Sequence, residues 1–254
     1  MRARDRHHRI LAKLVASEHV DIETLPKALG VSRETIRRDV LELEAQGKLR
    51  RLHGGITRVD PNVESPFDVR LKVNATRKRG IALRAARLVQ PGMLIAIDSG
   101  TTTLAFAAAI AGLPDVCVVT NSVEIARVLL AARREADVIL LGGRVSGDVP
   151  GIFGELTLAQ MRRFSPDLGV FSPVAVSGSE GATNFHLVEA EFAKVMVERS
   201  RRTVLLADHS KLGITSRVHV CDCAQIDTLV TDRSARKDHL AELRSGGIRD
   251  VIVD

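Results

Sequence analysis

The chain has 254 residues, 45% of them apolar and 27% charged, a globular composition that excludes wholesale disorder and collagen-like repeats. No apolar run approaches the roughly 20 residues that cross a bilayer, and three cysteines are too few for a disulfide framework. We therefore expect a cytoplasmic protein of one or two domains, without a membrane partner. The net charge is +6, of which residues 1–58 hold +5, and this basic head predicts a polyanionic partner.

Aromatic residues indicate which polyanion the head binds. The chain has no Trp or Tyr, and its first Phe is Phe67. Proteins that bind single-stranded nucleic acid usually stack the bases on aromatic rings. Duplex DNA is therefore favoured over RNA, and a translation factor is the less favoured alternative.

Three short helices are predicted in the head, residues 1–58. The first runs from about Arg6 to Ser17, and the second follows an N-cap at Asp21. The third begins after Ser32 and runs to about Gln46, with Gly47 as its C-cap. Its inward-facing residues are predicted to be Ile36, Val40, Leu41 and Leu43. A short basic β-hairpin is predicted over residues 48–55.

The spacing of the second and third helices is that of a helix-turn-helix, whose second helix enters the major groove of DNA. Arg pairs with guanine through two hydrogen bonds, and Ser or Thr contacts bases or phosphates. The basic hairpin is then a wing beside the phosphates or in the minor groove. An amphipathic helix with a solvated Arg face is the simpler alternative. The predicted DNA-binding residues are Ser32, Arg33, Thr35, Arg37 and Arg38 on the helix and Lys48, Arg50, Arg51 and His53 on the hairpin.

Residues 59–75 are predicted to be a linker, and residues 76–254 a second domain in which strands alternate with helices. This alternation, with continuously apolar strands, predicts an α/β fold with a mostly parallel sheet. The predicted strands lie near residues 93–98, 116–120, 138–141, 168–171, 204–208, 228–231 and 251–253.

Polar or glycine-rich loops follow three of these strands and should converge on one crevice at the carboxyl edge of the sheet. Loops of this kind bind anions through backbone N–H groups at helix N-termini. Lys211 is predicted to contact a phosphate, and Asp98 and Glu180 are predicted to contact hydroxyl groups. The simpler alternative is that Thr102, Asn121 and Ser122 only cap helices. The loop residues are Asp98, Ser99, Gly100, Thr101, Thr102, Thr103, Thr120, Asn121, Ser122, Gly142 and Gly143.

Residues 24–56, TLPKALGVSRETIRRDVLELEAQGKLRRLHGGI, resemble the DeoR-type winged helix of bacterial sugar-metabolism regulators, with a modest departure at Pro26. The body carries further motifs of the same family: IDSGTTT (97–103), VVTNS (118–122), LLGG (140–143), EAEFAK (189–194) and LADHSKLG (206–213). The resemblance implies a sensor domain with a fold similar to ribose-5-phosphate isomerase. It also implies a repressor, homodimeric or homotetrameric, that a phosphorylated sugar or sugar alcohol releases from operator DNA.

An enzyme is the alternative of a different class. D-x-G-T-T also resembles the phosphate loop of sugar kinases, which need a second phosphate loop and a longer chain. A sugar-phosphate isomerase is the closer possibility, with Glu180 as the base near the sugar carbonyl. Cys221-x-Cys223 has no second pair at zinc spacing. We expect no catalytic residue, no metal and no cofactor.

Overall fold

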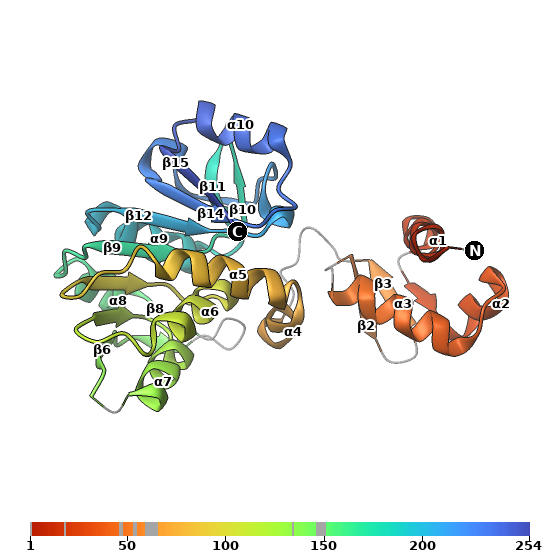
Figure 1. Ribbon diagram of the computed structural model, residues 1–254, viewed down its shortest axis with the longest axis horizontal. Helices are drawn as coiled ribbons and strands as arrows, with labels where there is room; N and C mark the ends of the chain where they lie inside the picture. Colours follow the sequence, from red (N-terminus) through yellow and green to blue (C-terminus); the bar gives the residue numbers. More distant parts are fainter. Residues whose placement is uncertain are drawn as a thin grey trace. The chain divides into compact units, whose positions relative to one another are not determined.

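The computed structural model describes residues 2–17, 19–45, 48–52, 55–58, 66–133, 135–145 and 151–254. The chain divides into two compact units, Met1–Ala75 and Thr76–Asp254 (Figure 1). Among the described residues, no helix has the length and apolar character needed to cross a membrane.

The N-terminal unit has the three predicted helices and the predicted hairpin. Its strands form an antiparallel sheet of order β1-β3-β2. The sequence did not predict β1, a three-residue strand that pairs with β3, or α4, a helix that lies within the predicted linker 59–75. The elements are α1 (Ala3–Ala16), β1 (His19–Asp21), the 3-10 helix η1 (Ile22–Thr24), α2 (Leu25–Leu29), α3 (Arg33–Ala45), β2 (Leu49–Leu52), β3 (Gly55–Arg58) and α4 (Phe67–Lys72).

One apolar stripe of α3 forms the centre of this small core. Ile36, Val40 and Leu43 follow one another at helical spacing and are buried, together with Ile10 of α1. The prediction that Leu41 points inward is wrong, because its side chain is 41% exposed. Leu41 follows Val40 directly, and one residue along a helix turns a side chain about 100° away from the stripe.

The C-terminal unit is built on a parallel sheet, as predicted, whose seven strands have the order β15-β14-β12-β9-β4-β5-β6. The strand order reverses between β4 and β9, so the loops after these two strands lead to opposite sides of the sheet. In such sheets the crevice at the reversal is the usual ligand position. The strands are β4 (Leu94–Ile97), β5 (Cys117–Thr120), β6 (Asp137–Leu140), β9 (Leu168–Phe171), β12 (Thr203–Leu206), β14 (Thr228–Thr231) and β15 (Asp250–Val253).

Helices cover both faces of this sheet, and residues along the strands alternate between two apolar cores. Ile95 and Ile97 pack in the core shared with α5, α6 and α7, whereas Ala96 packs in the core shared with α8, α9 and α10. The helices are α5 (Ala75–Ala86), α6 (Thr101–Ile110), α7 (Val123–Ala132), α8 (Glu155–Met161), α9 (Leu187–Arg199) and α10 (Lys237–Ser245).

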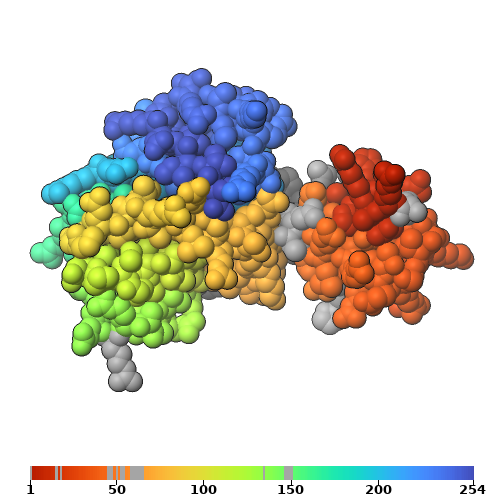
Figure 2. Space-filling view, viewed as in Figure 1, coloured from red at the N-terminus to blue at the C-terminus, as the bar shows by residue number. Residues whose placement is uncertain are grey.

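Helix α5 joins the two halves of this unit. In Figure 2 its yellow surface lies between the green surface of α6 and α7 and the blue surface of the C-terminal residues. Arg77 forms an ion pair with Asp232, and Arg84 lies 3.8 Å from Asp254, so charged contacts also connect α5 to the end of the chain.

The sequence reading missed the short strands and 3-10 helices around the sheet. β7 and β8 form a two-stranded ribbon, and β10, β11 and β13 form a small antiparallel sheet. β7 and β8 have only two residues each, too few to show a hydrophobic period, and β10, β11 and β13 contain polar residues or glycine in place of a continuous apolar run. They are β7 (Arg144–Val145), β8 (Ile152–Phe153), β10 (Ala175–Ser177), β11 (Gly181–Asn184), β13 (Val218–Cys221), η2 (His209–Lys211) and η3 (Cys223–Gln225).

Candidate functional site

Three of the predicted DNA-binding residues, two from the helix and one from the wing, come together in the N-terminal unit. Arg33 and Arg37 of α3 and Arg51 of β2 line a groove of about 200 Å³. Ile22, Pro26 and Val40 also line it. The arginines, with Ser32, Arg38 and Lys48, are exposed. The side chain of Arg50 and all of His53 lie outside the described residues.

The first turn of α3 is held by its own side chains. Ser32 Oγ accepts a hydrogen bond from the Thr35 backbone N–H at 3.2 Å, and the two hydroxyl oxygens lie 2.9 Å apart. Ser32 is therefore the N-cap of α3, as predicted, and Thr35 is half-buried beside it. Both hydroxyls stand at the end of the helix that a helix-turn-helix presents to DNA.

Two of the arginines already have carboxylate partners. Arg51 Nε lies 2.6 Å from Glu44 Oε2, and an Arg37 nitrogen lies 3.8 Å from Glu34 Oε2. Exposed ion pairs of this kind contribute at most about 1 kcal/mol. A DNA phosphate or guanine edge can therefore replace either carboxylate at little cost.

A buried ion pair fixes α3 against α1. Arg6 donates two hydrogen bonds to Asp39, Nε to Oδ2 at 2.6 Å and Nη2 to Oδ1 at 2.8 Å, and His7 Nε2 lies 3.1 Å from Oδ1. Asp39 is 3% exposed. Burial alone raises its pKa, but the hydrogen bonds from Arg6 and His7 outweigh burial, so the pKa stays below the usual range. The cluster ties the middle of α3 to the first turns of α1.

We expect Arg37→Ala and Arg38→Ala to weaken operator binding by about 1–3 kcal/mol where the lost contact is to a base. Affinity for the operator and for an unrelated duplex is measured at one salt concentration. A base contact lowers only the operator affinity. A phosphate contact lowers both equally and reduces the salt slope by about one. Unchanged affinity for both duplexes would remove these residues from the interface.

In the C-terminal unit, Asp98 lies at the carboxyl end of β4, where the first predicted loop begins. Its Oδ2 accepts a hydrogen bond from the Ser172 backbone N–H at 3.2 Å. Its Oδ1 is buried and has no hydrogen-bond partner. Burial raises the pKa of Asp98 to about 6, although the contacts with Ser172 and Thr103 and the charge of Lys211 act in the opposite direction. A buried carboxyl group with a raised pKa is typical of functional sites.

The same loop places the start of α6 beside a buried lysine. Lys78 of α5 is 5% exposed, and its Nζ donates a hydrogen bond to Thr101 Oγ1 at 2.9 Å. Gly100 is the N-cap of α6 and provides no side-chain acceptor for its first N–H groups. Thr102 Oγ1 is buried without a partner, so Thr102 does not cap the helix. A buried ammonium and an uncapped helix N-terminus both favour an anion.

The sequence did not predict Lys78 as a site residue. It stands in the run Arg77-Lys78-Arg79 on a helix with many basic residues, a pattern typical of a solvated face. Only the position of α5 against the first loop distinguishes Lys78 from its neighbours.

The second loop has mainly structural contacts. Thr120 Oγ1 donates to the Ile97 carbonyl at 2.8 Å and joins β5 to β4. Ser122 Oγ accepts from the Ile125 N–H at 3.3 Å and caps α7, which is the simpler alternative for this residue. Asn121 donates from Nδ2 to the Ile152 carbonyl at 3.2 Å, but its buried Oδ1 has no partner. Asn121 is therefore the residue of this loop with an acceptor left for a ligand.

The third loop is bonded to α8. The Gly142 N–H donates to Gln160 Oε1 at 2.8 Å, and Thr157 Oγ1 donates to the Gly142 carbonyl at 2.9 Å. Gly143 has φ +153°, and an added Cβ would meet Thr157 Oγ1 at 2.1 Å. The glycines thus allow close packing of α8 on the loop, and the Gly142 amide is already used.

Lys211 contacts the segment after β9, and Glu180 lies in the turn at the other end of β10. Lys211 Nζ donates to Ser172 Oγ at 3.2 Å and to the Pro173 carbonyl at 2.6 Å. Lys211 therefore contacts Ser172, whose backbone N–H donates to Asp98. Glu180 is exposed in the turn between β10 and β11, at the end of β10 far from Pro173. The residue on which the isomerase alternative depended therefore lies apart from the loops.

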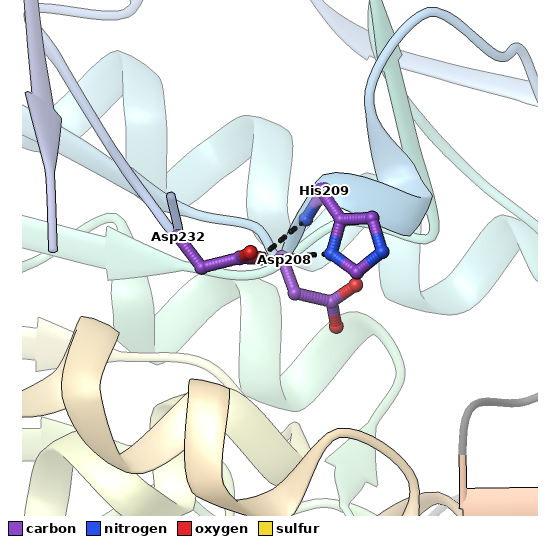
Figure 3. Close-up of side chains that lie close together, drawn as sticks. All are labelled: Asp208, His209 and Asp232. Carbon is purple, nitrogen blue, oxygen red and sulfur yellow. Dashed lines mark hydrogen bonds and ion pairs between the residues drawn. The ribbon is translucent and has the colours of Figure 1, made fainter. Parts of the chain in front are cut away.

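Asp208, His209 and Asp232 form a polar cluster at the carboxyl ends of β12 and β14 (Figure 3). One ligand atom from each lies within 4.8 Å of the others, a spacing that a metal ion accepts. Asp232 is 4% exposed, and its pKa is lowered to about 2 despite burial, because His209 and Ser234 donate hydrogen bonds to it. Arg77 forms an ion pair with the same carboxylate at 2.7 Å.

An arginine-lined helix-turn-helix in one chain with an α/β unit that carries a candidate anion site defines the class of ligand-sensing DNA-binding regulators. Sequence profiles agree: the DeoR-like helix-turn-helix domain matches residues 6–62, and the DeoR C terminal sensor domain matches residues 73–233. The chain belongs to the DeoR family of transcriptional regulators.

Curated relatives match the chain almost end to end. The glycerol-3-phosphate regulon repressor of Escherichia coli is 30% identical over 91% of this chain and 92% of its own length. The regulator GlpR of Haloferax volcanii is 32% identical over 97% of this chain and 96% of its own. The repressor GlcR of Bacillus subtilis is 29% identical over 96% and 94%.

Solved structures are more distant. Ribose 5-phosphate isomerase A of Methanocaldococcus jannaschii aligns with 54% of each chain at 17% identity and a TM-score of 0.41. Translation initiation factor eIF-2B of Pyrococcus horikoshii aligns with 90% of this chain and 87% of its own at 14% identity and a TM-score of 0.47. These likenesses are too distant to carry an argument about function.

Proposed function

We propose that this regulator is a repressor of genes for the use of a sugar or sugar alcohol, and that a phosphorylated metabolite of that compound releases it from its operator. The relatives named as repressors of glycerol-3-phosphate and other regulons support repression. The effector class is supported by two cations on one loop: Lys78 donates to Thr101 at the uncapped start of α6, and the charge of Lys211 acts on Asp98, where the loop begins.

The phosphate belongs at the start of α6. Backbone N–H groups there lack a side-chain cap, and Lys78 adds a positive charge from a buried position. Hydrogen bonds between charged groups in a buried site are about twice as strong as those between neutral groups. The helix N-terminus and the ammonium together favour a dianionic phosphate over a carboxylate.

The hydroxyl groups of the effector belong beside Asp98 and Asn121. Each has a buried oxygen acceptor without a partner in the described structure. Buried acceptors are nearly always satisfied, so a ligand with donors on adjacent atoms suits them. A polyol chain has that arrangement of hydroxyl donors.

The operator is proposed to have two half-sites. Helix-turn-helix proteins bind as dimers, and their two recognition helices reach half-sites about one helical turn, or a multiple of it, apart. A homodimer or homotetramer therefore fits the proposed function.

We expect Lys78→Met to weaken binding of a phosphorylated effector at least tenfold, since a hydrogen bond to a charged group is worth about 1.5–3 kcal/mol. Calorimetric titration uses glycerol 3-phosphate and glucose 6-phosphate, each beside its unphosphorylated parent. Arg79→Met is the control, because Arg79 is exposed on the same helix. Operator affinity without effector should be unchanged in both variants. Equal binding of phosphorylated and parent compounds by the native protein would contradict the proposed function.

A further inference from the structure

We propose that Asp232 is a positioning residue that holds the two lysine-bearing elements of the ligand site, α5 and η2, in fixed relation to each other. The proposal rests on the proposed function of that site, because it concerns how Lys78 and Lys211 act on one ligand. It assigns a role to Arg77 and Asp232, for which the sequence predicted none, and to His209 of the motif LADHSKLG.

The two oxygens of the Asp232 carboxylate accept hydrogen bonds from α5, from the start of η2 and from nearby Ser234. Oδ1 accepts from Arg77 Nη1 at 2.7 Å and from the Ser234 N–H at 2.9 Å. Oδ2 accepts from the His209 N–H at 2.8 Å and lies 3.1 Å from His209 Nδ1 (Figure 3). Arg77 also donates to Ser234 Oγ. The carboxylate thus connects α5 to the start of η2.

The two partners of Asp232 adjoin the two cations of the site. Arg77 is the residue before Lys78, whose Nζ contacts Thr101 at the start of α6. His209 lies two residues before Lys211 in the same 3-10 helix, and Lys211 Nζ contacts Ser172 and Pro173. A shift of either element relative to the other therefore changes the separation of the two ammonium groups.

A metal ion is the competing explanation for the Asp208–His209–Asp232 cluster. The hydrogen bonds above use the lone pairs that Asp232 would offer to a metal, and the Arg77 guanidinium already supplies the positive charge. Asp208 Oδ1 accepts from the Ser210 N–H at 3.0 Å and from Ser210 Oγ, and so caps η2. These contacts are those of a hydrogen-bond cluster that supports the site, not of a metal-coordination shell.

The test is the energetic coupling between the two lysines. Affinity for glycerol 3-phosphate and glucose 6-phosphate is measured for Lys78→Met, Lys211→Met and the double variant, first with native Asp232 and then with Asp232→Asn. We expect the lysine effects to be strongly non-additive in the native background and additive with Asp232→Asn, which alone weakens binding about tenfold. A residue that only stabilises the fold lowers the melting temperature without altering this coupling.

Arg77→Met supplies a second variant should Asp232→Asn fail to fold. We expect it to reduce the coupling in the same way, because it removes the contact between α5 and Asp232. The Arg77 side chain is 40% exposed, so its loss should destabilise the fold less. Arg84→Met is the matched control on α5, since Arg84 pairs with Asp254, 3.8 Å away, and not with Asp232.

Coupling that survives in both variants overturns the positioning role and leaves the proposed function standing. Coupling that is lost only when Zn²⁺ or Mn²⁺ is removed from the native protein by a chelator favours the metal explanation and also overturns the role. Absence of any phosphorylated-ligand binding by the native protein overturns both the role and the proposed function.

Discussion

Replacing Asp39 by alanine is expected to lower the free energy of unfolding of the N-terminal unit by about 3–5 kcal/mol, the usual cost of removing one partner from a buried ion pair. The change leaves the Arg6 guanidinium, whose side chain is 13% exposed, without its carboxylate, and His7 loses the same partner. A unit of this size has a total stability of only several kcal/mol. Operator binding should therefore be lost together with the fold of this unit at 37 °C.

Chemical denaturation of the N-terminal unit, followed by circular dichroism, measures this loss. The matched control is the double variant Arg6→Met with Asp39→Leu, which replaces both charges by apolar side chains and should recover most of the stability. A loss under 1 kcal/mol for Asp39→Ala would contradict a buried, functional ion pair.

The same carboxylate predicts how this unit responds to acid. The pKa of Asp39 is lower in the folded protein than in the unfolded chain. Its contribution is therefore fully present above the unfolded pKa, near 4, and is lost as the pH falls through the folded pKa. In Arg6→Met with Asp39→Leu this part of the acid sensitivity should disappear.

Asp98→Asn is expected to stabilise the sensor unit while removing its response to the effector. Burial raises the folded pKa of Asp98 to about 6 from an ordinary value of 3.8, so the folded state holds the carboxylate at a cost near neutral pH. A raised acidic pKa means that stability falls as the pH rises from about 4 to 6. At pH 7.5 the cost is on the order of 3 kcal/mol, and a neutral amide avoids it.

Thermal unfolding of native protein and Asp98→Asn at pH 4 and pH 7.5 tests this expectation. The variant should melt higher at pH 7.5, and the difference should largely vanish at pH 4, where the native carboxyl is also neutral. Ser122→Ala is a useful control, since loss of the α7 cap lowers the melting temperature at both pH values. A variant that is less stable at pH 7.5 would contradict the cost of burying the Asp98 carboxylate.

A carboxylate that costs stability and has an unpaired buried oxygen is best explained by a ligand. Functional sites commonly retain groups that lower the stability of the free protein. Asp98 was recognised in the sequence because it ends an apolar strand and begins a glycine-containing loop. Its unpaired oxygen depends on where Ser172 and Lys211 lie, which the sequence pattern does not reveal.

The strands of the parallel sheet were predictable because each is a short apolar run followed by a polar loop. The buried stripe of α3 followed in the same way from its helical period, with Leu41 misplaced because it adjoins that stripe. The two-residue strands β7 and β8 were not predictable, since two residues show no period. Pairing of distant segments, not local pattern, creates them.

The candidate site was predictable only in part, for the same reason. Lys211 was assigned from its place after a strand, and the structure sets it beside Asp98. Lys78 and Arg77 look like any other basic surface residues until α5 is placed against the first loop and β14. Glu180 was chosen as the one glutamate in a polar loop, but the small antiparallel sheet carries that loop away from the other residues.

The decisive experiment is binding of the purified protein to the DNA upstream of its own gene, titrated with sugar phosphates at fixed salt. We expect sequence-preferring binding with a steep salt dependence and release by one phosphorylated compound, but not by its unphosphorylated parent. The same compound should fail to release the Lys78→Met variant. Binding that no phosphorylated compound reverses would contradict the proposed effector site, and absence of sequence preference would contradict the regulator itself.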